Sequence, residues 1–247
     1  MTLKTTVKPT VNLAEFDQTY RLEHEQRFTP ERTGREVDVL IEVLGLNPSE
    51  RVLDLGCGWG RHLAELKKRG FENLVGVDVQ GAFLEPVEGV TMLEGYAAQL
   101  EFEAEFDAVY CAFSALLSTP EAAQNVFSAV ARTLKPGGRF LFDVTNRERL
   151  VQAEPSRSWR GGDGLPWVLE ETRFDLLTGA QVISQTRVYP GGHTETRTLT
   201  RFHYTLAELA QILQSAGLTV ANVYGDWQLH PYTAESPRTL LIARKEH

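Results

Sequence analysis

The sequence predicts an α/β protein built on a mostly parallel sheet, with a smaller antiparallel sheet inserted toward its C-terminal end. Between residues 51 and 146, short apolar runs alternate with helical patterns. Such alternation is typical of parallel strands joined by right-handed crossovers. Residues 147–203 break the alternation with segments rich in Thr, Val, Arg and aromatic residues. A chain of 247 residues is long enough for one such domain with an elaboration.

The first 50 residues are expected to be helical. Ala14 to His24 and Thr33 to Leu44 carry apolar residues at helical spacing. We interpret residues 1–50 as a helical cover over a pocket at the edge of the sheet. Tyr20 and Arg21 either touch a ligand there or only pack against the core.

The predicted core follows as five strands and two long helices. The strands are expected at 51–56, 73–78, 90–95, 106–112 and 139–145, and the helices at 60–69 and 121–134. Only eleven residues separate Asp78 from Val90, which is short for a full crossover helix. We expect a short helical turn around Ala82 to Leu84 instead.

The remaining segments form the insertion and the end of the core. A meander of three antiparallel strands is expected, at 170–174, 181–189 and 194–204. Thr205 is a candidate N-cap for a helix from Leu206 to Ala216, with Glu208 completing a capping box. The strands at 219–224 and 239–244 are expected to pair as an antiparallel hairpin at the sheet edge. The predicted divisions are therefore 1–50, the core at 51–146 with 204–247, and a substrate-side insertion at 147–203.

The most informative segment is 51–62, in which a buried strand ends and three glycines follow at alternate positions. Gly56, Gly58 and Gly60 occupy one turn before a helical stretch. Glycine suits a backbone that turns sharply or lies against a ligand, because it has no Cβ. A strand, a glycine-rich turn and a helix start together indicate a nucleotide or nucleoside pocket at the carboxyl edge of a parallel sheet.

The spacing of these glycines leaves the ligand open. The pattern is G-x-G-x-G rather than the G-x-G-x-x-G of dinucleotide binders, and the sequence has no G-x-x-x-x-G-K-[ST] phosphate loop. A ligand without phosphates needs only close backbone approach and a carboxylate for its ribose. Asp78 lies 18 residues after Gly60, close to the roughly 20 expected for a ribose-binding acid.

Four motifs in order resemble one known family. Val52 to Gly60 resembles motif I of the class I S-adenosylmethionine-dependent methyltransferases, and Gly76-Val77-Asp78 resembles their acidic motif II. Phe106 to Val109 is similar to the start of their fourth strand, and Leu134 to Phe140 to the turn before their fifth. The resemblance implies a Rossmann-like sheet with its last strand antiparallel. It also implies S-adenosyl-L-methionine as cofactor and S-adenosyl-L-homocysteine as product.

The resemblance assigns expected cofactor contacts. Gly56, Gly58 and Gly60 would line the methionine side, Asp54 would organise the turn, and Asp78 would accept from both ribose hydroxyls. Further contacts are expected near this turn and at the ends of neighbouring strands, from Cys57, Val79, Tyr96, Ala97, Ala98, Cys111 and Phe113.

The adenine side departs from the family pattern. Tyr96 stands where related enzymes often carry an Asp that accepts from the adenine amino group. Adenine would instead be held by backbone amides near Ala97 and apolar contact, or by Gln99.

The chain as a whole resembles a subgroup of small-molecule methyltransferases that carry an inserted sheet. Methyl transfer from a sulfonium requires mainly positioning and exclusion of water, so the sequence need not contain an obligatory catalytic residue. We expect the acceptor pocket to be lined by residues of the meander together with Phe113, Ser114, Asn146 and Arg147.

The candidate catalytic residues are Asn146, Arg201 and His203. Along 195–203 the odd positions share one face, which carries Arg197 as well as Arg201 and His203. This face either anchors a carboxylate and offers a base, or is a solvated face paired with Glu170 and Glu171.

The two cysteines and the histidines suggest no further chemistry. Cys111 lies where cytosine methyltransferases use a cysteine, but their Pro-Cys or Thr-Cys setting is missing, so a buried structural thiol is favoured. Cys57 lacks a flanking base and is interpreted as a small turn residue. The histidines show no ligand spacing, so no metal site is predicted.

Composition narrows the function further. The formal net charge of −8 argues against a broad phosphate-binding surface, so a nucleic-acid partner is disfavoured. No apolar run approaches ~18 residues, so no membrane span is predicted, and two cysteines fit a reducing cytoplasm. We expect a monomer or homodimer that methylates a nitrogen or oxygen of a small molecule. A tRNA-modifying methyltransferase and a non-catalytic cofactor-fold binding protein remain as alternatives.

Overall fold

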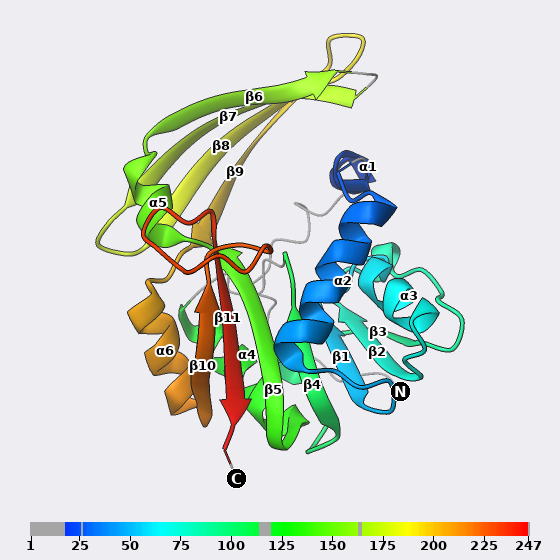
Figure 1. The fold of residues 1–247 in the computed structure, drawn as a ribbon. Coiled ribbons are helices and arrows are strands. Elements are labelled where there is room, and N and C mark those ends of the chain that lie inside the picture. The colour runs from blue at the N-terminus through cyan, green and yellow to red at the C-terminus, as the bar shows by residue number, and fades with distance from the viewer. Residues whose placement is uncertain (1–17, 26, 114–119, 163–164, 247) are drawn as a thin grey trace.

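The computed structural model describes residues 18–25, 27–113, 120–162 and 165–246 (Figure 1). These residues form a seven-stranded sheet flanked by helices and a separate four-stranded sheet. The four-stranded sheet stands beyond the carboxyl ends of the parallel core strands, on the same side as the first described helix (Figure 1). Within the described ranges, no helix combines the length and apolar character that a membrane span requires.

The seven-stranded sheet has the order β10-β11-β5-β4-β1-β2-β3. Its strands are β1 (Arg51–Leu55), β2 (Asn73–Asp78), β3 (Thr91–Glu94), β4 (Phe106–Cys111), β5 (Leu134–Thr145), β10 (Leu218–Tyr224) and β11 (Arg238–Lys245). The pairs from β5 to β3 are parallel, whereas β11 is antiparallel to both of its neighbours. The predicted mixed α/β class, with an antiparallel last strand, is therefore confirmed.

Helices cover both faces of this sheet. The helices are α1 (Gln18–Glu25), α2 (Pro30–Leu44), α3 (Arg61–Lys68), α4 (Pro120–Thr133) and α6 (Leu206–Ser215). On one face, Val37 and Leu40 of α2 join Leu63 and Leu66 of α3 in an apolar cluster against the sheet. On the other face, α4 and α6 contribute a second cluster that includes Phe127. The two clusters fix the sheet between helical layers, as the alternation of patterns predicted.

Local sequence signals explain where several elements begin and end. Thr29 caps α2 by accepting from the Arg32 amide, and Gly45 ends it with a φ of 58°. Thr205 and Glu208 form the predicted capping box of α6. A short 3₁₀ turn, η2 (Gly81–Phe83), replaces a full crossover helix after β2, as expected from the short segment there. A second 3₁₀ turn, η3 (Ala97–Gln99), follows β3.

The inserted sheet has four strands rather than the three expected. After the short helix α5 (Arg147–Gln152), the strands β6 (Ser156–Gly162), β7 (Leu165–Asp175), β8 (Ala180–Val188) and β9 (Thr194–Phe202) pair antiparallel in chain order. The sequence of β6 holds two Ser, two Arg and two Gly and no β-branched residue, so it lacked a strand signal. Gly161 and Gly162 end β6, and residues 163–164 lie outside the described ranges.

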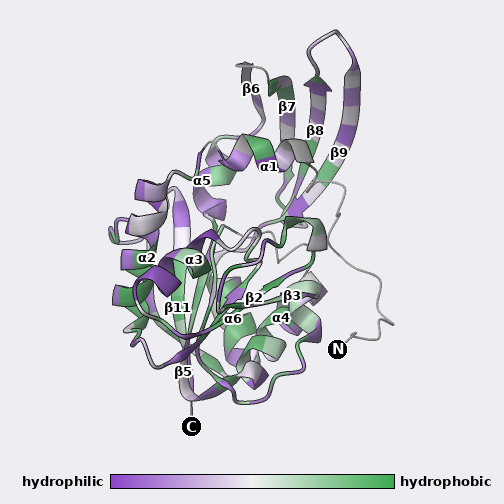
Figure 2. Ribbon diagram, turned by 90° about the vertical axis from the view of Figure 1, so that its right-hand side faces the viewer, coloured by the Kyte–Doolittle hydropathy of each residue, from purple (hydrophilic) through white to green (hydrophobic). Residues whose placement is uncertain are grey.

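The two faces of the inserted sheet differ in character, and Figure 2 shows hydrophilic bands along β8 and β9. The face that carries Val168 also buries Gln181, Gln185 and Arg187. We call this the inner face, because Arg160 on it acts electrostatically on His24 of α1. The opposite, outer face exposes apolar side chains, among them Trp159, Trp167 and Leu169.

Candidate cofactor and acceptor site

The turn between β1 and α3 is shaped by three left-handed glycines. Gly56, Gly58 and Gly60 have φ values of 75°, 55° and 79°, a region that residues with a Cβ adopt at a cost. The Gly56 amide donates to the Val77 carbonyl at 2.7 Å, which ties the turn to β2. A Cβ on Gly60 would lie 3.0 Å from Met92, whereas a Cβ on Gly58 would meet no atom within 4 Å. The backbone at Gly58 therefore borders open space, which fits a ligand that approaches the main chain.

Asp78 closes β2 beside this turn. Its Oδ2 accepts from the Gly58 amide at 2.8 Å and its Oδ1 accepts from the Gln80 amide at 2.8 Å. Partial burial raises the pKa of Asp78, and these backbone hydrogen bonds oppose that effect. Each carboxylate oxygen keeps lone-pair capacity for one more donor. These two backbone hydrogen bonds fix the orientation of the Asp78 carboxylate beside the glycine turn.

Asp54 lies behind the turn in a dry environment. Its Oδ2 accepts a 2.9 Å hydrogen bond from the Tyr110 hydroxyl, and both side chains are buried. Burial raises the pKa of Asp54 to about 7, while the Tyr110 bond and the charge of Arg61 act in the opposite direction. Burial also raises the pKa of the Cys57 thiol, which keeps it protonated and agrees with its interpretation as an unreactive turn residue.

A buried charged cluster between α2 and α3 adjoins Asp54. Glu36 accepts from Arg32 at 2.8 Å, from Arg61, and from Nε2 of His62 at 3.1 Å. Burial lowers the pKa of His62 to about 4, so its ring is neutral and donates to the Glu36 carboxylate. Sequence reasoning did not find this cluster, because Glu36 occupies an ordinary helical pattern whose partner surface only the tertiary structure defines.

Aromatic rings gather at the ends of β1 and β4. Phe113 and Trp227 stack with centroids 5.0 Å apart, and Phe28 lies 5.6 Å from Phe113 and 6.2 Å from Trp59. The Arg61 guanidinium lies 4.0 Å from the Phe28 ring centroid. We call Phe28, Trp59, Phe113 and Trp227 the aromatic cluster. Electron-rich ring faces attract cations, and a sulfonium is a cation.

Asp143 holds one side of the aromatic cluster in place. This fully buried carboxylate accepts from the Phe113 amide at 3.1 Å, from Nε1 of Trp227 at 3.2 Å and from Nε of Arg238 at 2.7 Å. Phe113 has a φ of 56°, which is unusual for a residue with a large side chain. The Asp143 contact stabilises that backbone and orients both stacked rings.

The predicted adenine-side residues lie along the turn after β3 and beside β2. Ala97 is buried in η3, Tyr96 and Val79 are half-buried, and Ala98 is exposed. The Gly95 amide donates to the Asp78 carbonyl at 3.0 Å, which places this turn next to the ribose-binding candidate. Cys111 is fully buried at the end of β4, as predicted for a structural thiol.

The first described helix lies over the same edge. Tyr20 stacks on His24 with centroids 3.8 Å apart and lies 6.2 Å from Phe83 of η2. Arg21 pairs with Glu25 at 2.7 Å and with Glu85, and its guanidinium lies 5.9 Å from the Trp59 centroid. These contacts put both side chains beside the glycine turn. Residues 14–17 of the predicted helix and Ser114 of the predicted acceptor wall lie outside the described residues.

Asn146 is engaged in contacts within the chain. Its Nδ2 donates to the carbonyls of Thr233, Ala234 and Ser236 at 2.9–3.2 Å. Its Oδ1 accepts from the Glu148 amide and from the Tyr232 hydroxyl. Such a pattern fits an anchor that joins the end of β5 to the loop before β11.

The other acceptor-side candidates lie on or just after β9. Arg201 stands opposite Gln181 and Arg197 opposite Gln185 in the β8–β9 register. Nε of Arg197 donates to Gln185 at 2.7 Å, and Gln185 in turn donates to Glu170 at 2.6 Å. Glu170 thus belongs to the inner face. Glu171, the other carboxylate considered as a partner, pairs with Arg157 and Arg173 on the outer face.

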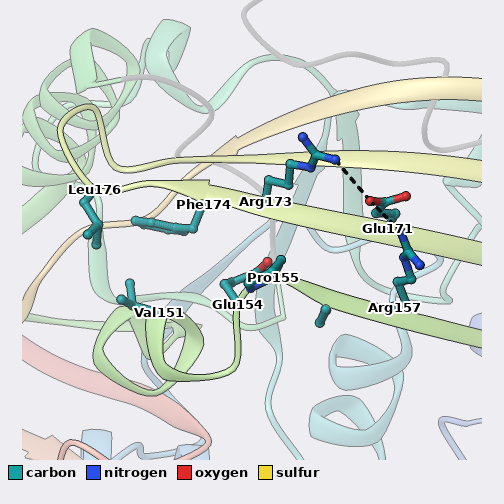
Figure 3. A pocket seen from close by; sticks show the side chains of 9 residues that line it. Val151, Glu154, Pro155, Arg157, Glu171, Arg173, Phe174 and Leu176 are labelled. Carbon is teal, nitrogen blue, oxygen red and sulfur yellow. Dashed lines mark hydrogen bonds and ion pairs between the residues drawn. The ribbon is translucent and has the colours of Figure 1, made fainter.

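A separate cavity of about 650 Å³ opens at the base of the inserted sheet (Figure 3). It is lined by residues of α5, β6, β7 and the segments next to them, including Val151, Glu154, Phe174 and Leu176, and by none of the glycine-turn residues. The cofactor candidates therefore do not line this cavity.

Comparison with known proteins agrees with this geometry. A family described as a methyltransferase domain matches residues 52–138, which span the glycine turn, Asp78 and the start of β5. The cypemycin N-terminal methyltransferase of a Streptomyces species is 31% identical over 79% of this chain and 83% of its own length. The chain belongs to the class I S-adenosylmethionine-dependent methyltransferases. S-adenosyl-L-methionine is accordingly its cofactor.

Solved structures of Rossmann-like methyltransferases share this fold. The CcbJ methyltransferase of Streptomyces caelestis has a TM-score of 0.73 at 22% identity, covering 87% of this chain and 90% of that one. The amino pentose methyltransferase CalS10 of Micromonospora echinaspora, solved with bound cofactor, has a TM-score of 0.71 at 20% identity, covering 93% and 97%. At these identities the likeness establishes the fold.

Proposed function

We propose that this methyltransferase transfers a methyl group to a nitrogen or oxygen of a small molecule by in-line displacement. The observation that carries the proposal is the juxtaposition of two features at one sheet edge. The open backbone at Gly58 beside Asp78 suits the adenosyl part of the cofactor, and the aromatic cluster adjoins it. When bound, the cofactor supplies a methyl group that its positive sulfur has already activated.

In this proposal, the chain holds the cofactor through groups on both sides of the glycine turn. Gly56, Gly58 and Gly60 present backbone to the methionine part, and Asp78 accepts from the ribose hydroxyls. Asp54, buried behind the turn, would organise the backbone that meets the amino-acid end of the cofactor. The adenine would lie against Val79 and the turn formed by Tyr96, Ala97 and Ala98, whereas the fully buried Cys111 would stay behind the pocket wall.

The acceptor would enter between the aromatic cluster and the inner face of the β6–β9 sheet. Phe113 follows the carboxyl end of β4, and the Arg238 guanidinium lies 5.7 Å from the centroid of its ring. Arg238 also acts electrostatically on His203, so it links the aromatic cluster to the inserted sheet. Residues 1–50 would cover this space and residues 147–203 would form its substrate side. Rings and packed strands that exclude water would hold the nucleophile near the methyl, which is the main requirement of the reaction.

Names of similar proteins favour a nitrogen acceptor as the first to test. One relative is named an N-terminal methyltransferase, and two structural neighbours are named an amino pentose methyltransferase and a sugar N-methyltransferase. A relative of lower coverage, 45% of this chain, is named an O-methyltransferase, so hydroxyl acceptors belong in the same panel.

The experiment is a turnover screen with cofactor labelled on its methyl group. Small primary amines, amino sugars and phenols are offered singly, beside fractions of a metabolite extract. The proposal expects label in a small organic product with stoichiometric S-adenosyl-L-homocysteine. Label recovered only in added tRNA, or cofactor binding without turnover in any fraction, would contradict it.

A further inference from the structure

The side chain of Gln181 lies between an imidazole and a carboxylate on the inner face. Nε2 of His203 lies 3.2 Å from Oε1 of Gln181, and Nε2 of Gln181 donates to Oε1 of Glu154 at 2.6 Å. The Thr172 hydroxyl contacts both Glu154 oxygens at 2.7 Å. The four side chains form one connected network; Gln181 and Thr172 in it are buried, and Glu154 at its end lines the cavity of Figure 3.

This network determines which nitrogen of His203 carries the proton. A carboxylate only accepts hydrogen bonds, so Glu154 requires the amide N–H₂ of Gln181 to face it. The amide oxygen of Gln181 then faces His203, and that oxygen accepts only from a protonated Nε2. The remaining ring nitrogen, Nδ1, is left with its lone pair in the neutral imidazole.

Nδ1 of His203 has no hydrogen-bond partner among the described residues, and the His203 side chain is half-buried. The charged groups that act on the ring are Arg201 on β9, Arg147 at the start of α5 and Arg238 on β11, while Phe174 of β7 lies 6.1 Å away. Burial, reinforced by these three charges, lowers the pKa of His203 to about 4, so the ring is neutral near pH 7. A neutral ring with a free lone pair on Nδ1 accepts a hydrogen bond, and its low pKa makes it a weak base near pH 7.

We propose that Nδ1 of His203 accepts a hydrogen bond from the N–H or O–H of the methyl acceptor and so orients its lone pair, and that Glu154 and Gln181 are positioning residues that fix the imidazole tautomer. The inference rests on the proposed function, because it needs an acceptor bearing N–H or O–H. The acceptor lone pair bonds to the methyl carbon and the carbon–sulfur bond breaks, leaving its electron pair on sulfur. The acceptor's proton is lost to water after the methyl has transferred, and His203 stays neutral throughout.

The tautomer is measured directly on the full chain, without any acceptor. Two-bond proton–nitrogen correlation spectra of the ¹⁵N-histidine-labelled protein at pH 7 distinguish the two neutral forms, and the His203→Gln variant identifies the signals. We expect a single Nε2–H form in the native protein and the appearance of the Nδ1–H form in Glu154→Gln. Glu171→Gln is the matched control, since Glu171 lies on the outer face and pairs with Arg157 and Arg173 (Figure 3).

Two spectroscopic results would overturn the inference. One is an Nδ1–H form of His203 in the native protein, and the other is an unchanged His203 spectrum in Glu154→Gln. Both are independent of whether the chain methylates anything, so they separate this inference from the proposed function. Calorimetric titration with S-adenosyl-L-methionine checks that each variant still folds and binds its cofactor.

Turnover then tests the catalytic consequence, using whichever amine or phenol the labelled screen returns as the probe. We expect His203→Gln and Glu154→Gln each to lower kcat/KM by about tenfold, because one orienting hydrogen bond to the acceptor is lost. Glu171→Gln should leave kcat/KM unchanged. A Glu154→Gln variant that shifts the tautomer yet keeps the native kcat/KM would show that Nδ1 of His203 does not orient the acceptor.

Discussion

The backbone amide of Gly58 donates a 2.8 Å hydrogen bond to Oδ2 of Asp78, so the glycine turn and the acid at the end of β2 form one unit. The contact joins two neighbouring strands of the core sheet at their carboxyl ends. A ligand that lies on the turn and is bound through its ribose would therefore contact both partners of a single hydrogen bond. Substitutions on either side of this bond should affect the cofactor more than the fold.

Replacing Gly58 with Ala should weaken cofactor binding. Its φ of 55° costs an alanine about 1–2 kcal/mol, and a Cβ there meets no atom of the chain within 4 Å. In the proposed complex, the Cβ would instead project into the space that the cofactor occupies. We expect at least a tenfold rise in the Kd for S-adenosyl-L-methionine, measured by calorimetry.

Gly45 provides the matched control for this substitution. It ends α2 with a φ of 58°, and a Cβ there also meets nothing within 4 Å. Gly45→Ala and Gly58→Ala should lose similar free energies of unfolding, but only Gly58→Ala should lose affinity. Equal cofactor affinity in the two variants would argue against a ligand on the turn.

Asp54 should make stability depend on pH in a distinctive direction. Burial raises its pKa from 3.8 to about 7 in the folded state, so between these values the folded chain binds more protons than the unfolded chain. Stability contributed by the protonated form is complete below pH 4 and is lost as the pH rises toward 7. The loss amounts to at most about 4 kcal/mol, from about 1.4 kcal/mol per pKa unit.

The Asp54→Asn variant isolates this effect, because it keeps the shape and an acceptor for Tyr110 but cannot ionise. The free energy of unfolding of the native protein, minus that of the variant, should fall between pH 4 and pH 7 in denaturant titrations. A difference that is flat over this window, or rises, is incompatible with a carboxyl group whose pKa burial has raised.

Glu36 should be important for stability, because it neutralises buried arginine charge. Burial by itself raises its pKa, but the His62 hydrogen bond and the charge of Arg61 lower it to about 2. Glu36→Gln leaves Arg61 without its carboxylate partner, and breaking a buried pair costs about 3 kcal/mol. Glu42→Gln, an exposed position on the same helix, should change the free energy of unfolding by less than about 0.5 kcal/mol.

The pH dependence of the Glu36 contribution has the opposite sign to that of Asp54. Because its folded pKa is depressed from 4.5 to about 2, its stabilisation is present above pH 4.5 and is lost as the pH falls toward 2. Denaturant titrations of the native protein and Glu36→Gln should therefore converge in acid. If the difference in free energy of unfolding between the native protein and Glu36→Gln stays constant down to pH 2, an ionised Glu36 is not the source of the stabilisation.

The parts of the fold that the sequence predicted are those encoded by local pattern. The core strands are apolar runs bounded by turn residues, and the Thr205–Glu208 capping box is a four-residue signal. The strand β6 was missed because pairing with β7, rather than its own composition, makes it a strand. The expected three-strand meander was wrong for the same reason.

The candidate site likewise contains some residues that local sequence pattern predicts and others that it does not. Gly58 and Asp78 belong to motifs with fixed spacing, so their proximity could be anticipated. Glu36 and Arg61, which are 25 residues apart, join two helices, and the contact of Glu154 with Gln181 joins a loop to a strand. Neither partnership has a spacing rule, because the packing of whole elements brings the side chains together. His203 was therefore predicted as a candidate base without the residues that orient it.

Calorimetric titration of the native chain and of Asp78→Ala with S-adenosyl-L-methionine tests the central claim most directly. Asp38→Ala, at an exposed position of α2, serves as the control for removing an acid. The account predicts saturable binding by the native and control proteins and at least a tenfold higher Kd for Asp78→Ala, about 1.4 kcal/mol. Equal affinity of Asp78→Ala and the native protein would contradict it.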